Sequence, residues 1–363
     1  MQKLLHTMVF MAFTLLFALA TAQQGTTIVS DLNGPMGLLV DDDGNLWVVD
    51  SGTGGEQVID VTSPHTGQVM SATFGDTSQV IRIAPDGTQE LIALLPSLNL
   101  GQEMVGGARL ATLDGDIYAT VGFWMEGSDA DPGPVTASVV RLDGSEVVRV
   151  ADLWAFERDH NPDDLVVESH PYGLTVGPDG MLWVADAGGN TLLRVDPETG
   201  DIELLAVFDG IESPLPNPNR RGAMESDPVP TGITVGADGT VYVGLLPGFP
   251  FIPGSGKVVT VTPEGQVSDH APGLTMITDV QVGPDGNLYA VQIGVFTEEG
   301  PVPNSGAVIR IAHGEVTEVL GELSFPTAIA FNHRGDAFIT VNGAGGPGGA
   351  VVQYEGLAGG NSN

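Results

Sequence analysis

The sequence predicts an all-β fold, a six-bladed β-propeller. Three observations carry this prediction: a repeated strand–turn–strand unit, an aromatic residue at one fixed place in each unit, and a last unit without a fourth strand. The clearest copies of the unit are GPMGLLVDDDGNLWVVD from Gly34 and HPYGLTVGPDGMLWVAD from His170. Each joins two apolar, β-branched segments through an Asp-Gly turn, which is typical of an antiparallel hairpin.

The spacing of the repeats sets the number of blades. The glycine of the first turn recurs at Gly44, Gly115, Gly180, Gly239, Gly286 and Gly335, with gaps of 71, 65, 59, 47 and 49 residues. A four-stranded blade takes about 40–50 residues, so each gap holds one blade and its insertions. The aromatic residues are Trp47, Tyr118, Trp183, Tyr242, Tyr289 and Phe338. We expect them to fill the space between blades rather than to stack on a ligand.

The two ends of the repeat predict how the ring closes. The last unit ends at AVVQYEG with no strand after it, whereas TTIVSDL at residues 26–32 is similar to the fourth strands of other units. We therefore expect the N-terminal strand to complete the last blade, which removes two open sheet edges. The predicted propeller spans residues 23–356, and residues 357–363 are expected to form a flexible tail.

The beginning of the chain is typical of an exported protein. Lys3, an apolar run from Leu4 to Ala20 and the small residues around Ala22 predict a signal peptide over residues 1–22. We expect a secreted, periplasmic or extracellular protein that does not insert into a membrane. The chain has no cysteine, which excludes disulfides and thiol chemistry.

The charge is strongly negative. The whole chain has 12 Lys and Arg against 46 Asp and Glu, a net charge of −34, and loss of Lys3 makes it −35. A surface of this charge repels phosphate backbones and anionic lipids, so nucleic acid is not an expected partner. The remaining expected partners are a small molecule or an extracellular protein or polymer, and we expect a monomer.

Several segments resemble known families. VADAGGNTLLRVD from Val184 is similar to NHL-type propellers, and ADLWAFERDHNPD, ESHPYGL and GLLPGFPFIPGSGKVVTV resemble the ScyD/ScyE family of secreted bacterial propellers. In that family an Asn commonly precedes PYG, where this chain has His170. The resemblance implies an NHL-like fold and secretion, and no particular activity.

The loops predict which face binds a ligand. Turns on one face are short, whereas the connections on the opposite face are long, and long loops on a rigid scaffold are where binding residues concentrate. At the channel mouth on that face, the first inner-strand position is small in four blades, but Arg109 and Asp279 occupy it in the second and fifth. These opposite residues can grip a polar or zwitterionic ligand, or pair with each other and plug the channel.

Other candidate residues lie around the same mouth. Asp50 and Asp186 end matching second strands, while His170 and Tyr172 begin the third blade. The segment with Asp163, Asp164 and Glu168 is rich in oxygen ligands, so Ca²⁺ is a possible cofactor there, although the spacing matches no regular metal motif. Phe249 and Phe251 form an apolar loop that either contacts a partner or packs on a neighbouring loop.

Two functions follow from these patterns. The first is a secreted binding or scaffold protein that uses the long-looped face. The alternative is a hydrolase, lactonase or lyase with a divalent cation at the channel mouth. Three or more carboxylate, Asn or His side chains converging on the axis would favour the enzyme, and the sequence offers Asp279 there without an obvious set.

Overall fold

The computed structural model describes residues 24–62, 67–101, 103–297, 299–344 and 346–359. The predicted signal peptide lies outside the described residues. Strands account for 57% of the chain and helix for 3%, so the all-β prediction is confirmed. Within the described residues, no helix is long and apolar enough to cross a membrane.

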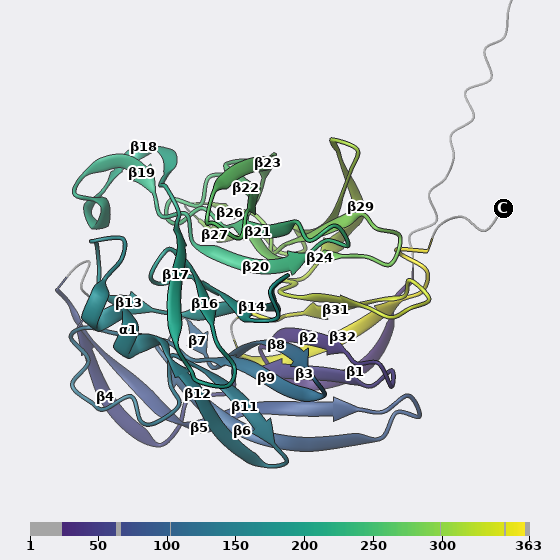
Figure 1. Cartoon of the computed structure of the whole chain (residues 1–363), viewed down its shortest axis with the longest axis horizontal. Coiled ribbons are helices and arrows are strands. Elements are labelled where there is room, and N and C mark those ends of the chain that lie inside the picture. Colours follow the sequence, from purple (N-terminus) through teal and green to yellow (C-terminus); the bar gives the residue numbers. More distant parts are fainter. Residues whose placement is uncertain (1–23, 63–66, 102, 298, 345, 360–363) are drawn as a thin grey trace, which may run out of the picture.

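Within the described residues, six sheets contain four or more strands, and these sheets follow one another in chain order (Figure 1). In five of them the four main strands pair in chain order, and in the sixth the N-terminal strand pairs with the last strand. The first three sheets consist of β2 (Pro35–Val40), β3 (Leu46–Asp50), β5 (Val69–Ile83) and β6 (Gln89–Asn99); β8 (Gly107–Leu113), β9 (Asp116–Val121), β11 (Ser138–Asp143) and β12 (Glu146–Asp152); and β14 (Pro171–Val176), β15 (Leu182–Asp186), β16 (Thr191–Val195) and β17 (Ile202–Val207).

The next sheets repeat this order. They consist of β20 (Pro230–Val235), β21 (Val241–Leu245), β22 (Gly256–Val261) and β23 (Val267–Leu274); β24 (Ile277–Val282), β25 (Leu288–Gln292), β28 (Gly306–Ala312) and β29 (Glu315–Leu323); and β30 (Ile329–Phe331), β31 (Ala337–Val341), β32 (Pro347–Tyr354) and β1 (Thr26–Asn33). In the sixth sheet β1 pairs antiparallel with β32, with several register shifts.

The first strands of the sheets contact one another around a circle. β2 contacts β8, β8 contacts β14, and the contacts continue through β20 and β24 to β30, which contacts β2 again. The first strand of every sheet therefore lies at the centre, and the fourth lies at the rim. This arrangement is that of a β-propeller, in which the sheets surround a common axis.

The repeated aromatic residues lie between the sheets, as expected for core positions. Trp47, Tyr118, Trp183 and Tyr289 are buried, and each packs in an apolar cluster. Three also bond to the aspartate of the preceding turn, as in the Trp183 Nε1–H donated to Asp179 at 3.0 Å. The turn sequence and the aromatic residue thus form one local unit, in which the ring fills the core while its polar atom remains satisfied.

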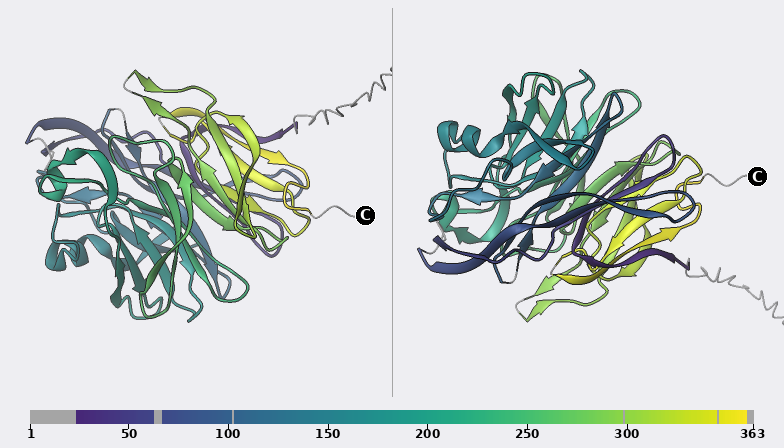
Figure 2. Two further views of the ribbon diagram at one scale, coloured as in Figure 1. Left: turned by 90° about the horizontal axis from the view of Figure 1, so that it is seen from above. Right: turned by 90° about the horizontal axis from the view of Figure 1, so that it is seen from below.

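Insertions project from one side of the ring (Figures 1 and 2). The first sheet carries β4 (Gln57–Thr62), which pairs with β5, and β7 (Met104–Val105), which pairs with β6. The other insertions are β10 (Trp124–Met125) with β13 (Glu168–Ser169), α1 (Leu153–His160), β18 (Ile211–Asn217) with β19 (Ala223–Ser226), the 3₁₀ turn Pro218–Arg220, and β26 (Phe296–Thr297) with β27 (Gly300–Pro301).

The C-terminal segment is partly packed. Ala358 is 2% exposed, belongs to the cluster around Tyr289, and donates its backbone N–H to the carbonyl of Gly335 at 2.9 Å. Residues 357–359, which we expected in the flexible tail, therefore lie against the last sheets. Residues 360–363 are outside the described chain.

Candidate ligand site at the ring axis

Arg109 and Asp279 meet at the centre of the ring. Each is the third residue of its inner strand, β8 or β24, and these strands belong to the second and fifth sheets. Nε of Arg109 lies 3.5 Å from Oδ1 of Asp279, and the two side chains are 4% and 2% exposed. We call this contact the central ion pair.

The rest of the guanidinium is engaged by backbone carbonyls. Nη1 donates to the carbonyls of Met36 and Ala108, the latter at 2.9 Å. Nη2 donates to the carbonyls of Thr278 at 2.5 Å and Thr327 at 2.9 Å. Four of the five N–H groups of the guanidinium are therefore donated to carbonyls, and the fifth, on Nε, lies 3.5 Å from Asp279 without a hydrogen bond. This geometry agrees with the second alternative from the sequence, in which Arg109 and Asp279 pair with each other and close the channel.

The central ion pair also sets the electrostatic environment at the axis. Burial raises the pKa of Asp279, and the neighbouring Arg109 opposes that rise. Tyr172 covers the guanidinium, with Cζ of Arg109 4.4 Å from the ring centroid. The position that a divalent cation would need is therefore filled by a guanidinium. The residues present at the axis do not fit such a cation, since the carboxylate there already faces Arg109.

Asp50 and Asp186 are the last residues of β3 and β15, and both accept hydrogen bonds there. Both are 1% exposed. Asp50 accepts backbone N–H groups of Asn33 and Gln79, at 3.2 and 2.8 Å, and burial raises its pKa to about 6. Asp186 accepts the Ser169 hydroxyl at 2.6 Å and the N–H of His170 at 2.7 Å. The oxygens of both aspartates thus accept hydrogen bonds from the protein around the mouth, and Asp186 positions His170.

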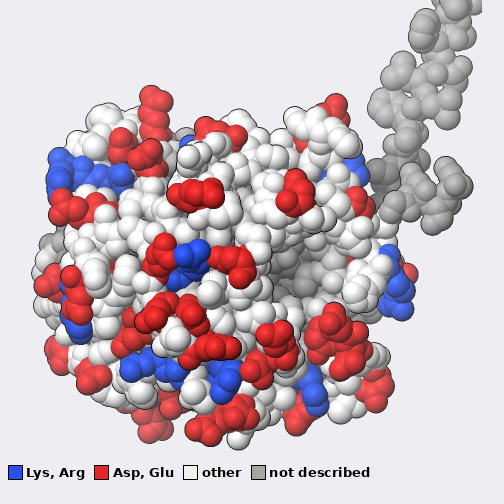
Figure 3. Space-filling view, in the orientation of Figure 1, with Lys and Arg blue, Asp and Glu red and all other residues white. Residues whose placement is uncertain are grey.

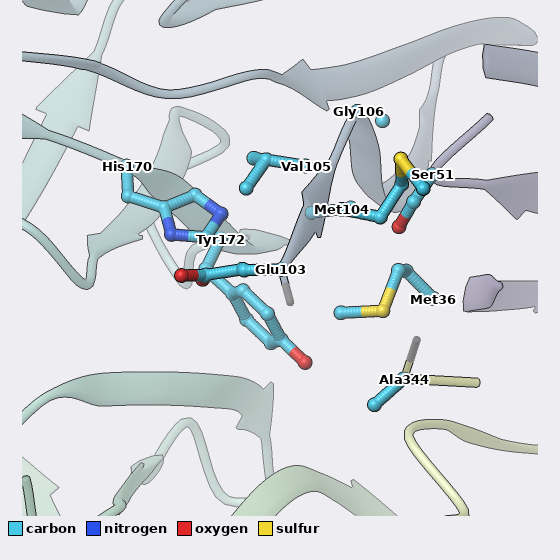
Figure 4. A pocket seen from close by; sticks show the side chains of 11 residues that line it. Met36, Ser51, Glu103, Met104, Val105, Gly106, His170, Tyr172 and Ala344 are labelled. Carbon is cyan, nitrogen blue, oxygen red and sulfur yellow. The ribbon is translucent and has the colours of Figure 1, made fainter. Parts of the chain in front are cut away.

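His170 and Tyr172 line a cavity of about 150 Å³ beside the central ion pair (Figure 4). We call it the His170 pocket. Its wall also contains Met36, Met104, Glu103 and Ser51. Figure 4 shows His170, Tyr172 and Glu103 on one side, with the two methionines and Ser51 opposite. Met36, His170 and Tyr172 lie at the starts of inner strands, Ser51 follows a second strand, and Glu103 and Met104 lie at β7, which places the pocket on the face with the long connections.

The chemistry of the His170 pocket is mostly apolar and carries no free cation. Burial, with a smaller effect of Arg109, lowers the pKa of His170 to about 4, so its ring is neutral near pH 7. Its ring meets those of Phe123 and Tyr172 edge to face, at 5.8 and 5.6 Å between centroids. Glu103 is exposed where it lines the pocket. The pocket therefore offers a carboxyl group and neutral acceptors beside methionine and aromatic surface.

The three metal candidates do not converge. Asp164 is exposed and pairs with Arg221 at 2.6 Å. Asp163 is half-buried and accepts the amide of Asn190 at 2.9 Å. Glu168 lies in β13 and lines a separate cavity of about 100 Å³, where burial and then Asp227 raise its pKa to about 8. Within the described chain, no three His, Asp or Glu side chains are arranged to hold a metal ion.

In the apolar loop that contains Phe249 and Phe251, one phenylalanine is packed and the other is exposed. Phe251 packs against Phe296 of the next sheet, with ring centroids 5.7 Å apart. Phe249 contacts Phe251 but is 72% exposed. Packing on a neighbouring loop thus describes Phe251, and Phe249 remains available to a partner.

Sequence reasoning did not select most of the pocket wall. Met36 lies in a repeated unit but at a position without a distinctive residue type, and Ser51, Glu103 and Met104 belong to connections of the first sheet that carry no motif. The one available signal was position, since Met36 and Ser51 flank the same hairpin as Asp50. Acidic side chains cover much of the surface, and basic ones mostly stand beside them (Figure 3).

The fold and its axis define a β-propeller, and comparison with solved structures agrees. Similar structures include β-propellers of the NHL and SMP-30-like type. Another similar structure is a protein of unknown function from Bacteroides thetaiotaomicron, with 12% identity, coverage of 92% of this chain and 72% of that chain, and a TM-score of 0.55.

Two other similar structures have names that suggest an activity. Regucalcin from Agrobacterium tumefaciens, a calcium-binding protein, has 12% identity, 92% and 96% coverage and a TM-score of 0.50. A protein provisionally assigned as a gluconolactonase has 11% identity, 93% coverage of each chain and a TM-score of 0.50. At these identities the likeness shows the fold alone. No protein-family model matches the chain, and no curated protein matches its sequence.

Proposed function

We propose that this chain is a secreted β-propeller binding protein that takes a small ligand group in the His170 pocket. The observation that carries the proposal is the pocket itself, which lies beside the axis on the face with the long connections. The proposal treats the six sheets as blades of one closed ring. The pairing of β1 with β32 and the contact of β30 with β2 support that closure.

The wall of the pocket favours one ligand chemistry. A cavity of about 150 Å³ is the size that takes a benzene ring in an engineered apolar core. Met36, Met104 and Tyr172 supply apolar and polarizable surface. Glu103 and the neutral His170 supply acceptors, whereas four of the five N–H groups of Arg109 are already donated to backbone carbonyls. The ligand group is therefore small and apolar or aromatic, and carries a cationic or hydrogen-bond-donating substituent rather than a carboxylate.

The alternative, a hydrolase, lactonase or lyase with an axial divalent cation, is compatible with the fold. Proteins named as calcium-binding or as a gluconolactonase share it. Such an enzyme needs oxygen ligands around a cation at the axis. Here Arg109 occupies the axis, and Asp50 and Asp186 are committed to backbone N–H groups. These contacts support binding over metal-dependent catalysis as the function of this face.

A matched pair of probes tests the proposal. Benzylamine and benzoate have the same ring and opposite charges near pH 7. Binding is measured by isothermal titration calorimetry in about 0.3 M NaCl, which screens the acidic surface. We expect benzylamine to bind more tightly than benzoate, and Glu103→Gln to reduce that preference at least threefold.

Blocking the pocket provides the control. Ala344 lies exposed at the pocket, so Ala344→Trp should close the mouth while leaving the fold intact. Val316→Trp, on the outer strand β29 where Val316 is 47% exposed, is the matched control and should bind as wild type does. Equal benzylamine binding by wild type and Ala344→Trp would refute the pocket as the site. Tighter binding of benzoate than of benzylamine would show that a positively charged group of the protein binds the ligand.

A further inference from the structure

Three buried oxygen atoms without hydrogen-bond partners lie near the C-terminal end of α1. They are Oε1 of Glu157, Oδ1 of Asn161 and Oδ1 of Asn190. Glu157 is 2% exposed and Asn190 is 5% exposed. A buried acceptor that is left unpaired destabilises the folded state. Three such acceptors in one region therefore indicate that a species absent from the polypeptide satisfies them.

The three side chains come from two segments that contact each other. Glu157 and Asn161 are four residues apart, on one face of α1 and its cap, and the N–H of Asn161 donates to the carbonyl of Glu157 at 2.7 Å. Asn190 lies in the turn between β15 and β16. A Cβ placed on the adjacent Gly189 would be 3.0 Å from Oε2 of Glu157, so this turn passes directly against the carboxyl group.

The direction of each amide is determined by its nitrogen. Nδ2 of Asn190 donates to the Asp163 carboxylate at 2.9 Å, and Nδ2 of Asn161 donates to the carbonyl of Leu165 at 3.2 Å. Turning either amide round would bring two acceptors together. Both amide oxygens must therefore face away from these partners, which leaves them without a donor from the protein.

The charges around these oxygens are negative. The carboxyl groups of Asp163, Asp186 and Glu168 lie near that of Glu157. The C-terminal end of a helix adds partial negative charge. Arg220 pairs with Glu225 and Asp227, and Arg221 pairs with Asp164. The region thus combines oxygen ligands with several carboxyl groups.

We propose that Glu157, Asn161 and Asn190 bind a calcium ion between α1 and the β15–β16 turn. Carboxylate and amide oxygens are the ligands that Ca²⁺ prefers, and water completes its coordination of six to eight oxygens. A single proton on Glu157 could satisfy only one of the two amide oxygens, whereas a cation satisfies all three atoms. The site differs from the axis and from the Asp164–Glu168 segment considered from the sequence, and it goes beyond the proposed ligand binding.

The site has a structural consequence for the ring face. The β15–β16 turn also contains the backbone N–H groups of Gly188 and Gly189, which bond to Asp186, and Asp186 holds His170. A cation on Asn190 would therefore fix the segment that positions His170 in its pocket. This role needs no contact between the ion and the ligand.

Calorimetry with CaCl₂ on the full mature chain, after treatment with EDTA and its removal, tests the proposal. We expect one ion per chain with a Kd of about 10⁻⁴–10⁻³ M, the range of extracellular calcium modules. Binding should persist in about 0.5 M NaCl, where non-specific attraction to the acidic surface is screened. Glu157→Gln should abolish it, because the amide keeps the shape but removes the charge and donates to the asparagine oxygens.

Two further variants keep the test decisive. Asn161 has φ of 39°, so Asn161→Gly suits the backbone, and we expect it to fold and to weaken Ca²⁺ binding at least tenfold. Asp164→Asn is the matched control, because Asp164 is exposed and should leave binding unchanged. The same isotherm for wild type, Glu157→Gln and Asn161→Gly would overturn the proposal. So would no binding by wild type at about 20 mM Ca²⁺, well above the expected Kd, which would assign a protonated carboxyl to Glu157.

Discussion

Replacing Arg109 by Met is expected to destabilise the ring severely. The variant keeps an unbranched side chain of similar length but removes the charge and every N–H group. Asp279 would then remain 2% exposed with two backbone partners, the N–H groups of Val280 and Ile329, and no cation. Breaking a buried ion pair by removing one partner costs about 3–5 kcal/mol.

The carbonyls add to this cost. Four carbonyl groups lose a charged donor, and each costs about 1–3 kcal/mol if it stays dry. Water entering the space beside the methionine offsets part of that loss. We therefore expect the free energy of unfolding to fall by at least about 4 kcal/mol.

Urea titration followed by tryptophan fluorescence measures the effect. The midpoint should fall while the slope stays constant, since the unfolded surface does not change. Arg141→Met is the control, because Arg141 forms an exposed pair 3.4 Å from Asp116 and should cost less than about 1 kcal/mol. Adding Asp279→Asn to Arg109→Met should recover part of the loss. The opposite result would be a free energy of unfolding of Arg109→Met within about 1 kcal/mol of wild type together with loss of ligand binding. It would show that the guanidinium binds the ligand and is not needed for stability.

Three other outcomes follow from the described contacts. Deleting residues 26–32 removes buried Val29 and Leu32 and opens the edge of β32, so we expect aggregation or a large fall in Tm, and an unchanged Tm would exclude a closing role for β1. His170 has a folded pKa of about 4 against about 6.5 unfolded, so its contribution to stability falls by about 2 kcal/mol from about pH 7 to about pH 5. His170→Gln should remove that part of the loss of stability at acid pH, as measured by urea titrations. The same pH profile of the unfolding free energy in wild type and variant would contradict the burial of a neutral His170. Tm should rise from low to about molar NaCl as self-repulsion is screened, and a flat or falling dependence in thermal melts would show that charge does not limit stability.

The fold was predictable because its causes are local and repeated. A turn such as the one at Asp179 determines its own hairpin and orients Trp183 in the core, and the same chemistry recurs along the chain. The placement of Arg109 and Asp279 at the axis followed as well, since equivalent positions of successive repeats must lie on one circle. The packing of Ala358 on the last sheets was not visible, because a short glycine-rich ending carries no pattern.

By itself the sequence determined the β-sheet repeats, the acidic surface and the set of residues at the mouth. Only the tertiary structure decided what those residues do. Arg109 could have faced a ligand or the protein, and the choice depends on four backbone carbonyls that no side-chain pattern encodes. Likewise, Glu157 and Asn190 meet across 33 residues because an insertion folds back on a turn. Periodic sequence patterns indicate which side of a strand is buried. A site forms where loops and insertions without such a pattern come together, and their positions depend on how the whole chain folds.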